Sequence, residues 1–410
     1  MVQTIDTATG EGIGMLKKLS CLILPLGLMA VSLIPSQPVS AEGSETDLAP
    51  EAVSAILLDA GTGKVLYEKN SHQPLPPASI TKVMTMLLVM EAIDQGKISW
   101  SDPVRVSEHA ASMGGSQIFL EPGEQMTVHD LFKAMAISSA NDAAVALAEY
   151  LGGTEERFVK MMNDKARELG LKNTHFENCN GLPASGHYSS AYDIAVMSRE
   201  LLSYPKVTNY TGLYEDYLRK DSKKPFWLVN TNKLVRFYPG MDGLKTGYTS
   251  EAKYCLTATA KRNNLRFIAV VMGEPDVKKR NQEVSSMLDH AFNHYTSQRI
   301  YNKGDLIAEK RIDKGNPDKI RIEAKQPIDM LIKKGESMRD YQKKWIWEDL
   351  KAPVKKGDRL GKLQIVKDGK VVAEWNLISN MEIQKANLWI SVKRSVKEML
   401  FLPDNVNTQM

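Results

Sequence analysis

A serine and a lysine at helical spacing are the first residues that could do chemistry together. Ser79 and Lys82 stand in the stretch Pro76-Pro77-Ala78-Ser79-Ile80-Thr81-Lys82. A serine hydroxyl is a weak nucleophile until a base accepts its proton, and a lysine amine becomes such a base when burial lowers its pKa. On one helix face the two side chains would be about 5–6 Å apart. The pair predicts nucleophilic catalysis if the helix is buried, and an N-cap serine beside a surface lysine if it is exposed.

The residues around Lys82 predict a helix that is buried on all sides. Apolar side chains recur at helical spacing at Ile80, Val83, Met84, Leu87 and Leu88. The opposite face is apolar as well, with Met86, Val89 and Met90, which is typical of a helix inside a protein. Gly96 marks its expected end.

Ser-x-x-Lys spacing alone does not decide for catalysis, because Ser203 to Lys206 and Ser250 to Lys253 share it. Two further groups of polar residues are candidates. Ser138-Ser139-Ala140-Asn141 lies between two predicted helices, where a simple interhelical turn is the alternative. Lys245-Thr246-Gly247 precedes an apolar stretch, and we predict a β-hairpin with this tripeptide at its start. Its glycine would let another backbone or a ligand approach the strand closely.

Composition excludes several classes of protein. The 410 residues are 43% hydrophobic and 25% charged, as in ordinary globular domains, and the net charge of +4 does not indicate a nucleic-acid partner. His290-x-x-x-His294 lacks the glutamate of a zinc helix, so we expect no metal and no cofactor. Cys179 and Cys255 do not form a metal-binding motif, and the sequence leaves open whether they pair in a disulfide bond.

Residues 1–41 have the pattern of a secretory signal peptide. Lys17 and Lys18 precede a mostly apolar run over residues 19–34, and Val39-Ser40-Ala41 offers the small residues that a signal peptidase needs. Met15 stands where such a peptide begins, so it is a candidate for the true start. A membrane-spanning anchor is the alternative, although the run is short and contains proline and glycine. We therefore expect an exported protein.

Four segments are predicted along the chain. They are a signal peptide (1–41), a catalytic domain (45–298), a small β-domain (299–384) and a tail (385–410). In the catalytic domain we expect a hairpin from residue 55 to 67, helices opened by Thr127, Thr154 and Ser190, and a closing helix over residues 282–295. The loop from His175 to His187 is open to a functional or a structural reading. Asp368-Gly369 predicts a hairpin turn in the β-domain.

The three polar groups together resemble the low-molecular-mass penicillin-binding proteins, specifically the exported D-alanyl-D-alanine carboxypeptidases. The matching stretches are Ala78–Thr85, Ser138–Ala143 and Asp242–Thr249, and they occur in the order known for this superfamily of serine enzymes. The resemblance covers residues 48–296 strongly and continues more loosely to the tail. It implies an α/β (α+β) serine β-lactamase/transpeptidase-like domain, with an antiparallel sheet and a helical cluster. A small all-β domain and a C-terminal amphipathic helix would follow it.

The resemblance also implies a role for each site residue. Ser79 would attack the carbonyl between the terminal D-alanines of a peptidoglycan stem pentapeptide, with Lys82 as proton acceptor, and β-lactam antibiotics would act as inhibitors. Ser139 would relay a proton and Asn141 would hold the substrate amide. The substrate-binding residues would be Lys245, Thr246, Gly247, Tyr248 and Arg280, the first two and Arg280 serving the terminal carboxylate. Many relatives have histidine at Tyr248, so only a backbone donor to the oxyanion is expected there.

Two other functions share these motifs. A serine β-lactamase commonly has Ser-Asp-Asn where this chain has Ser139-Ala140-Asn141, and the deacylation segment of class A enzymes is not found. An inactive wall-binding or penicillin-sensing module would not need all three motifs intact.

The tail predicts a short basic amphipathic helix. Apolar residues recur at Leu388, Trp389, Val392, Val396, Met399 and Leu400, and Lys393, Arg394 and Lys397 hold the other side. Such a helix is typical of a membrane interface. A helix packed on the β-domain is the alternative, and the family resemblance favours the membrane at the extracytoplasmic face.

Overall fold

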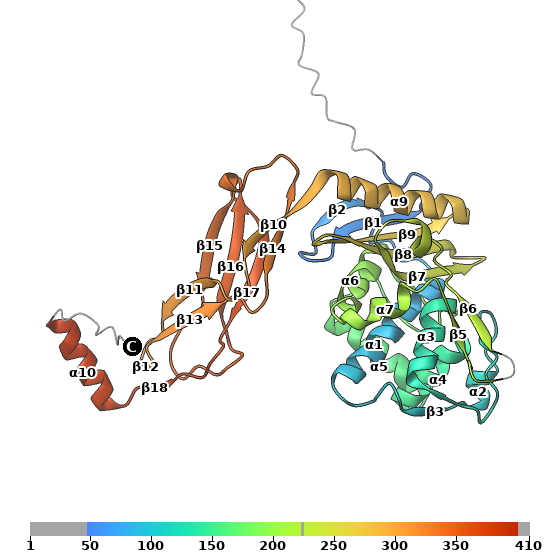
Figure 1. Cartoon of the computed structure of the whole chain (residues 1–410), viewed down its shortest axis with the longest axis horizontal. Helices are drawn as coiled ribbons and strands as arrows, with labels where there is room; N and C mark the ends of the chain where they lie inside the picture. The colour runs from blue at the N-terminus through green and yellow to red at the C-terminus, as the bar shows by residue number, and fades with distance from the viewer. Residues whose placement is uncertain (1–46, 223–224, 401–410) are drawn as a thin grey trace, which may run out of the picture. The chain divides into compact units, whose positions relative to one another are not determined.

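A five-stranded antiparallel sheet organises the first part of the chain (Figure 1). The computed structural model describes residues 47–222 and 225–400, so the predicted signal peptide lies outside the described residues. The sheet has the order β2-β1-β9-β8-β7. Its strands are β1 (Ser54–Asp59), β2 (Val65–Lys69), β7 (Met241–Thr249), β8 (Lys253–Arg262) and β9 (Leu265–Glu274). Because β1 pairs with β9, the early hairpin and the later strands form one sheet.

Helices cover both faces of this sheet (Figure 1). Helix α9 (Val277–His294) lies on one face, and a cluster that includes α1 (Lys82–Asp94), α3 (Val128–Ser138) and α6 (Ala191–Leu201) lies on the other. Each face of the sheet covers a hydrophobic core, and alternate residues of β1 point into one core or the other. Ile56 and Leu58 pack in the core of the helical cluster, whereas Ala55 and Leu57 pack beside α9. This alternation is the period of a strand that is buried on both sides. The predicted α+β architecture is confirmed.

The remaining elements of this domain are short or belong to the cluster. They are η1 (Ala78–Thr81), α1 (Lys82–Asp94), β3 (Pro103–Arg105), α2 (Glu108–Ala111), β4 (Gln125–Thr127), α3 (Val128–Ser138), α4 (Asn141–Gly152), α5 (Glu155–Glu168), α6 (Ala191–Leu201), η2 (Pro205–Val207), α7 (Thr208–Thr211), β5 (Glu215–Leu218), β6 (Phe226–Val229) and α8 (Leu234–Phe237). Every residue of α1 from Lys82 to Met90 is buried, as its apolar pattern predicts. Thr127, Thr154 and Ser190 each accept a backbone N–H at a helix start, which confirms the predicted caps.

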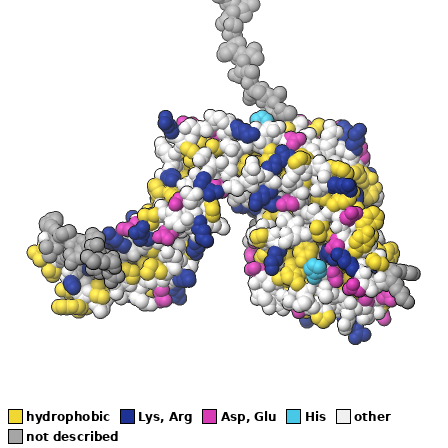
Figure 2. All heavy atoms as spheres, in the orientation of Figure 1, with side chains coloured by type: hydrophobic (Ala, Val, Ile, Leu, Met, Phe, Trp, Pro, Cys, Tyr) yellow, Lys and Arg dark blue, Asp and Glu magenta, His cyan; other side chains and the backbone are white. Residues whose placement is uncertain are grey.

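An all-β domain follows, as predicted, and ends in a helix. Its elements are β10 (Tyr295–Tyr301), β11 (Leu306–Arg311), β12 (Gly315–Asn316), β13 (Lys319–Glu323), β14 (Ile328–Lys333), η3 (Met338–Asp340), β15 (Gln342–Trp347), β16 (Arg359–Lys367), β17 (Lys370–Ile378), β18 (Gln384–Lys385) and α10 (Leu388–Met399). Asp368 and Gly369 have φ of 49° and 75° in the turn between β16 and β17, which confirms the hairpin turn. Hydrophobic side chains are exposed along α10 (Figure 2).

Two predicted elements are placed differently in the structure. Lys245-Thr246-Gly247 lies in the middle of β7, an edge strand of the central sheet, and not at the start of a hairpin. A polar side chain in a strand can face a cavity at a sheet edge, and the apolar pattern did not reveal this. Helix α9 begins at Val277, five residues earlier than predicted, because Asp276 caps it by accepting the backbone N–H of Lys279.

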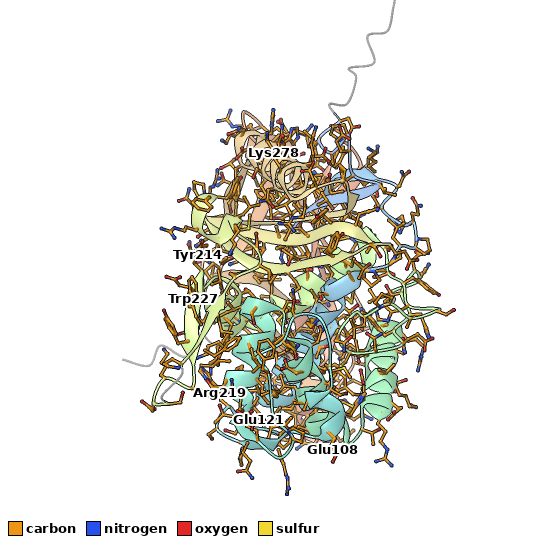
Figure 3. The ribbon with its side chains drawn as sticks, turned by 90° about the vertical axis from the view of Figure 1, so that its right-hand side faces the viewer. Glu108, Glu121, Tyr214, Arg219, Trp227 and Lys278 are labelled. Carbon is orange, nitrogen blue, oxygen red and sulfur yellow. The ribbon has the colours of Figure 1, made fainter. Side chains whose placement is uncertain are left out.

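The hairpin of β5 and β6 was not predicted. Tyr217 and Trp227 face each other across its two strands and are exposed, and Trp227 is labelled with the nearby Tyr214 in Figure 3. The two strands have only four residues each. Strands this short leave too few residues for a clear period of two.

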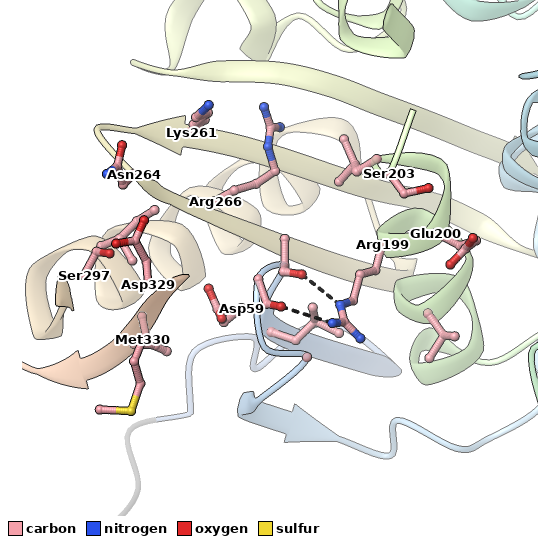
Figure 4. A pocket seen from close by; sticks show the side chains of 18 of the residues that line it. Asp59, Arg199, Glu200, Ser203, Lys261, Asn264, Arg266, Ser297, Asp329 and Met330 are labelled. Atoms are coloured by element: carbon pink, nitrogen blue, oxygen red, sulfur yellow. Dashed lines mark hydrogen bonds between the residues drawn. The ribbon is translucent and has the colours of Figure 1, made fainter. Parts of the chain in front are cut away.

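Arg199 of α6 forms hydrogen bonds with the turn between β1 and β2 (Figure 4). Its Nε donates to the carbonyl oxygen of Ala60 at 2.8 Å, and its Nη2 donates to that of Gly61 at 3.1 Å. Asp59 closes the turn from inside, because its carboxylate accepts both the N–H and the hydroxyl of Thr62.

The loop His175–His187 packs against η1 through a glycine. Gly181 has φ of +85°, and a Cβ at this position would lie 1.9 Å from the carbonyl oxygen of Ala78. Ala78 itself has φ of +48°, a strained value for a residue with a side chain. The loop therefore contacts the backbone of η1. This contact supports a structural role for the loop.

We predict that Gly181→Ala destabilises the protein more than Gly96→Ala. Both glycines have positive φ, but a Cβ at Gly96 would meet nothing within 4 Å, so that variant carries only the left-handed strain of about 1–2 kcal/mol. Gly181→Ala adds a steric clash with the Ala78 carbonyl. Calorimetric melting temperatures of the two variants check this, and equal decreases would show that the loop does not need this close contact.

Candidate active site

Ser79 and Lys82 are brought together by the 3₁₀ turn that opens α1. Residues three apart are almost eclipsed in a 3₁₀ helix, so the lysine side chain lies directly over the serine. Lys82 Nζ is 3.1 Å from Ser79 Oγ. The helix therefore holds the two groups in hydrogen-bond contact, which the spacing in the sequence predicts.

The amine of Lys82 has two further partners. Nζ is 2.6 Å from Asn141 Oδ1 and 2.6 Å from the carbonyl oxygen of Asn180. The residue is 0% exposed. Burial lowers the pKa of Lys82 to about 7, although Cys179 and Asp142 oppose this shift.

Ser139 and Asn141 lie where α3 ends and α4 begins. Ser139 has φ of +66° at the C-cap of α3, a conformation that makes the tight turn between the helices. Asn141 Nδ2 donates to the carbonyl oxygen of Gly114 at 2.7 Å, and its backbone N–H donates to that of Ser116. The amide of Asn141 is thus fixed between Lys82 and Gly114, with one N–H left.

Strand β7 contributes the Lys-Thr-Gly group. Lys245 is 1% exposed, and its Nζ donates to the carbonyl oxygen of Thr246 at 2.9 Å. Burial, and then the charges of Lys82 and Arg280, hold the pKa of Lys245 well below its usual value. A Cβ on Gly247 would lie 2.9 Å from the carbonyl oxygen of Pro77. This glycine therefore allows the backbone of β7 to approach the segment that carries Ser79, as predicted.

Arg280 and Tyr248 complete the surroundings. Arg280 lies in the first turn of α9 and is 4% exposed, and its guanidinium donates to Asn281 Oδ1 at 2.9 and 3.1 Å. The ring of Tyr248 is exposed and packs on that of Tyr254, with 4.4 Å between centroids.

One cavity of about 450 Å³ joins these residues. It is lined by Ser79, Ser116, Ser139, Thr231, Lys233, Thr246, Gly247, Tyr248, Tyr254, Val277 and Arg280. Lys82, Asn141 and Lys245 are buried beside these lining residues. All nine residues singled out from the sequence therefore lie in or next to one site. The arrangement can activate a hydroxyl with an amine and hold an anion with two further basic side chains, Lys245 and Arg280.

The sequence analysis did not identify several groups that fix the geometry of this site. Asn180 offers a backbone oxygen to Lys82, and backbone groups leave no signal in the sequence. The carboxylate of Asp142 accepts the N–H groups of Ile118 and Leu120, which fixes the loop above Asn141. Its position directly after Asn141 was the available signal.

His187 is the third group that was missed. Its Nδ1 accepts the backbone N–H of Glu177 at 3.0 Å, so Nε2 carries the proton and donates to Thr81 Oγ1 at 2.7 Å. Burial lowers the pKa of His187 to about 4. This neutral histidine ties the loop His175–His187 to η1, next to Ser79.

Cys179 and Cys255 are both buried and free, so the open question of a pairing is answered against a disulfide. Among residues 47–222 and 225–400, no group of three histidine, cysteine or acidic side chains has the arrangement of a metal site.

Comparison with known proteins decides the family. A family model described as D-alanyl-D-alanine carboxypeptidase matches residues 41–276, and a model of the C-terminal domain of penicillin-binding protein 5 matches residues 295–385. D-alanyl-D-alanine carboxypeptidase DacF of Bacillus subtilis (strain 168) is 53% identical over 383 residues, 93% of this chain and 98% of that protein. The chain belongs to the D-alanyl-D-alanine carboxypeptidase family. The family predicted from the three motifs is confirmed.

Solved structures agree with this family. Penicillin-binding protein 5 of Haemophilus influenzae is 32% identical, with a TM-score of 0.69 over 82% of this chain and 98% of that one. Penicillin-binding protein 6B of Escherichia coli is 33% identical, with a TM-score of 0.63 over 80% of this chain and 95% of that one. Penicillin-binding protein D2 of Listeria monocytogenes, in its ampicillin-bound form, is 32% identical, with a TM-score of 0.53 over 59% of this chain and 98% of that one. The chain is a carboxypeptidase of the penicillin-binding serine peptidases, which act on the cell wall.

We predict that His187→Gln removes part of the acid sensitivity of the fold. The pKa of His187 is about 4 in the folded protein and near 6.5 when unfolded. The unfolded state therefore binds the proton first, and stability is lost as the pH falls from 6.5 towards 4. The loss amounts to about 3 kcal/mol at most. Glutamine keeps one acceptor and one donor but does not titrate.

Chemical unfolding at pH 7 and at pH 4 measures this difference. The exposed histidine variant His72→Gln is the control and should keep the wild-type decrease. If His187→Gln lost as much stability on acidification as the wild type, His187 would not be the responsible group.

Proposed function

We propose that this carboxypeptidase removes the terminal D-alanine of peptidoglycan stem pentapeptides through an ester of Ser79. The observation that carries this proposal is the contact of 3.1 Å between Ser79 Oγ and the buried amine of Lys82. A serine with an adjacent base is the arrangement of covalent catalysis.

The hydrogen bonds of Lys82 support its role as the base. A neutral amine has two N–H donors and one lone pair. Asn141 Oδ1 and the Asn180 carbonyl oxygen can only accept here, so they take the two N–H groups. The lone pair is then directed at the hydroxyl of Ser79. As Oγ attacks the carbonyl carbon, its proton passes to Lys82 Nζ.

Two cations and a hydroxyl are suited to the terminal carboxylate of the substrate. Lys245 and Arg280 are both buried, and the charge of Arg280 lowers the pKa of Lys245. Thr246 and Arg280 line the same cavity. An entering carboxylate would relieve this repulsion between like charges. The terminal residue of the peptide would thus be bound by its charge, as carboxypeptidase activity requires.

The remaining groups serve the tetrahedral intermediate and its collapse. We assign the oxyanion to the backbone N–H groups of Ser79 and Tyr248, because such donors are a large electrostatic contribution in acyl transfer. Ser139 lines the cavity, where it can pass a proton to the nitrogen of the leaving D-alanine. The remaining N–H of Asn141 is suited to the substrate amide. Water then attacks the ester, which releases the tetrapeptide and restores Ser79.

A β-lactam antibiotic would acylate the same serine and block the enzyme. The proposal fits the ampicillin-bound form of the Listeria relative. Since stem peptides lie outside the cytoplasm, we further propose that residues 1–41 direct export and that the mature chain works at the extracytoplasmic side of the membrane.

Ser79→Ala is expected to abolish both D-alanine release and covalent penicillin labelling, while the fold is retained. Ser203→Ala and Ser250→Ala are matched controls, because these serines also precede a lysine by three residues. Mass spectrometry of a pentapeptide before and after incubation measures D-alanine release, and the mass of the intact protein measures labelling. Labelling of Ser79→Ala at wild-type level would contradict the assignment. Turnover of the antibiotic without D-alanine release would favour a β-lactamase.

We also propose that α10 holds the enzyme at a membrane surface. Leu388, Trp389 and Met399 are each more than three-quarters exposed, and Arg394 keeps the helix near the β-domain through the Gly315 carbonyl oxygen. An exposed apolar face beside basic residues favours an interface with anionic lipid. No helix in the described ranges is long and apolar enough to span a membrane.

Truncation before Leu388 is expected to release the mature protein from membranes without loss of activity on a soluble peptide. Trp389→Ser should weaken binding to vesicles of anionic lipid, and added salt should weaken it further. Trp345→Ser is the matched control, because Trp345 is also exposed but lies in β15. If the truncated protein stayed on the membrane, α10 would not be the anchor.

A further inference from the structure

A buried carboxyl group without a hydrogen-bond donor lies at the end of β9. Glu274 is 0% exposed. In the part of the chain that the structure describes, its two carboxyl oxygens are the buried side-chain atoms that no donor reaches. An ionised carboxylate in such a place is strongly unfavourable. The geometry therefore requires a proton on Glu274 or on a neighbour that can donate to it.

Glu283 is that neighbour, and its own hydrogen bonds show which member carries the proton. Glu283 Oε1 accepts the N–H of Glu51 at 2.9 Å, and Oε2 accepts the N–H of Ala52 at 3.1 Å. Both oxygens of Glu283 thus act as acceptors, as in an ionised carboxylate. Glu274 and Glu283 lie close enough for a hydrogen bond between their carboxyl groups to raise the pKa of Glu274. Glu274 is then the protonated partner, which donates to Glu283.

The surroundings keep this proton in place at neutral pH. Burial, Glu283, and the charges of Glu51 and Asp276 raise the pKa of Glu274 to about 9. Glu274 also interacts electrostatically with Arg280 and with the thiol of Cys255. Lys279 is engaged by Glu51 at 3.3 Å and so does not neutralise Glu274.

Glu283 of this pair lies one helical turn after Arg280. Glu283 follows Arg280 by three residues on α9, so the two share a face of the helix. The charge of Glu274 acts on Arg280, and Glu274 pairs across the sheet with Tyr254, which lines the catalytic cavity. A negative charge on Glu274 would attract the guanidinium away from the cavity and would repel Glu283.

We propose that Glu274 is a positioning residue for the known reaction: by sharing one proton with Glu283 it stays uncharged and leaves the charge of Arg280 to the substrate carboxylate. This inference rests on the carboxylate-binding role proposed above for Arg280. Loss of the proton to solvent creates a second anion that competes with the substrate. Substrate binding should therefore weaken in alkaline solution, before Arg280 itself can lose its charge.

The test compares the wild type with Glu274→Gln on a soluble peptide that ends in D-Ala-D-Ala, from pH 7 to pH 10.5. Glutamine mimics the protonated acid and cannot ionise. In the wild type KM should rise above pH 9, towards about tenfold per pH unit as a single ionisation requires, with a smaller change in kcat. In Glu274→Gln this rise should be absent or clearly smaller. Glu156→Gln, which alters an exposed carboxylate in the first turn of α5 that does not act on Glu274, is the control and should keep the wild-type rise.

A second measurement does not depend on the variant folding. Infrared spectra of the wild type in heavy water at neutral pH should contain the carbonyl band of a protonated carboxylic acid, which disappears near pH 9. Absence of this band at neutral pH would overturn the proposal. So would an alkaline rise of KM in Glu274→Gln equal to that of the wild type.

The role of Arg280 can be separated from that of Glu274. If Arg280→Gln left KM unchanged, the carboxylate-binding role of Arg280 would fail, and this proposal with it. If Arg280→Gln raised KM while Glu274→Gln kept the wild-type alkaline rise, only the role of Glu274 would be overturned.

Discussion

The complete burial of Lys82 is the constraint on which the active site depends. An ammonium group without water is strongly destabilised, and among the residues that the structure describes three oxygen atoms are within hydrogen-bond distance of its Nζ. Loss of a proton removes the free-energy cost of the buried charge, and the neutral amine that remains can act as a base. The basic groups of Lys245 and Arg280 are also buried nearby, and an anionic substrate would stabilise their charged forms in the same place where the base is made. Burial thus links binding of the terminal carboxylate to activation of Ser79.

The backbone around Ser79 has to be packed closely to keep water away from Lys82. Gly181 lies against the Ala78 carbonyl, and Gly247 lies against that of Pro77. Positive φ at Ala78 and Ser139 adds local strain, of a kind that persists only where surrounding packing fixes it. A displacement of about 1 Å at such a site can reduce a rate on the order of 100-fold. The sheet and the loop His175–His187 therefore belong to the catalytic machinery, although they contribute few reacting groups.

Local patterns in the sequence predict the parts of the site that lie within one element. Helix α1, its serine and lysine, and the junction that carries Ser139 and Asn141 follow from apolar spacing and helix caps. The position of Lys245 in an edge strand does not, because strand order depends on the pairing of β1 with β9, more than two hundred residues apart. Local patterns also cannot reveal contacts made by backbone oxygens, such as that of Asn180.

Some signals were present but ambiguous. Glu274 ends a largely apolar strand, and a carboxyl group there is equally compatible with exposure to solvent. His187 stands in a polar loop without any period, so nothing local distinguishes a buried histidine from an exposed one. In both cases burial is decided by segments distant in the sequence: α9 with the residues before β1 for Glu274, and η1 for His187.

The pH dependence of acylation tests the central claim most directly. Stopped-flow measurement of the acylation rate of Ser79 by a penicillin gives the protonation state of the base before any later step. If Lys82 is the buried amine, the rate should fall on acidification with a midpoint near pH 7, in line with a pKa of about 7, and Lys82→Arg should be inactive because arginine stays protonated. A midpoint near 10.4, the value of free lysine, would contradict this account.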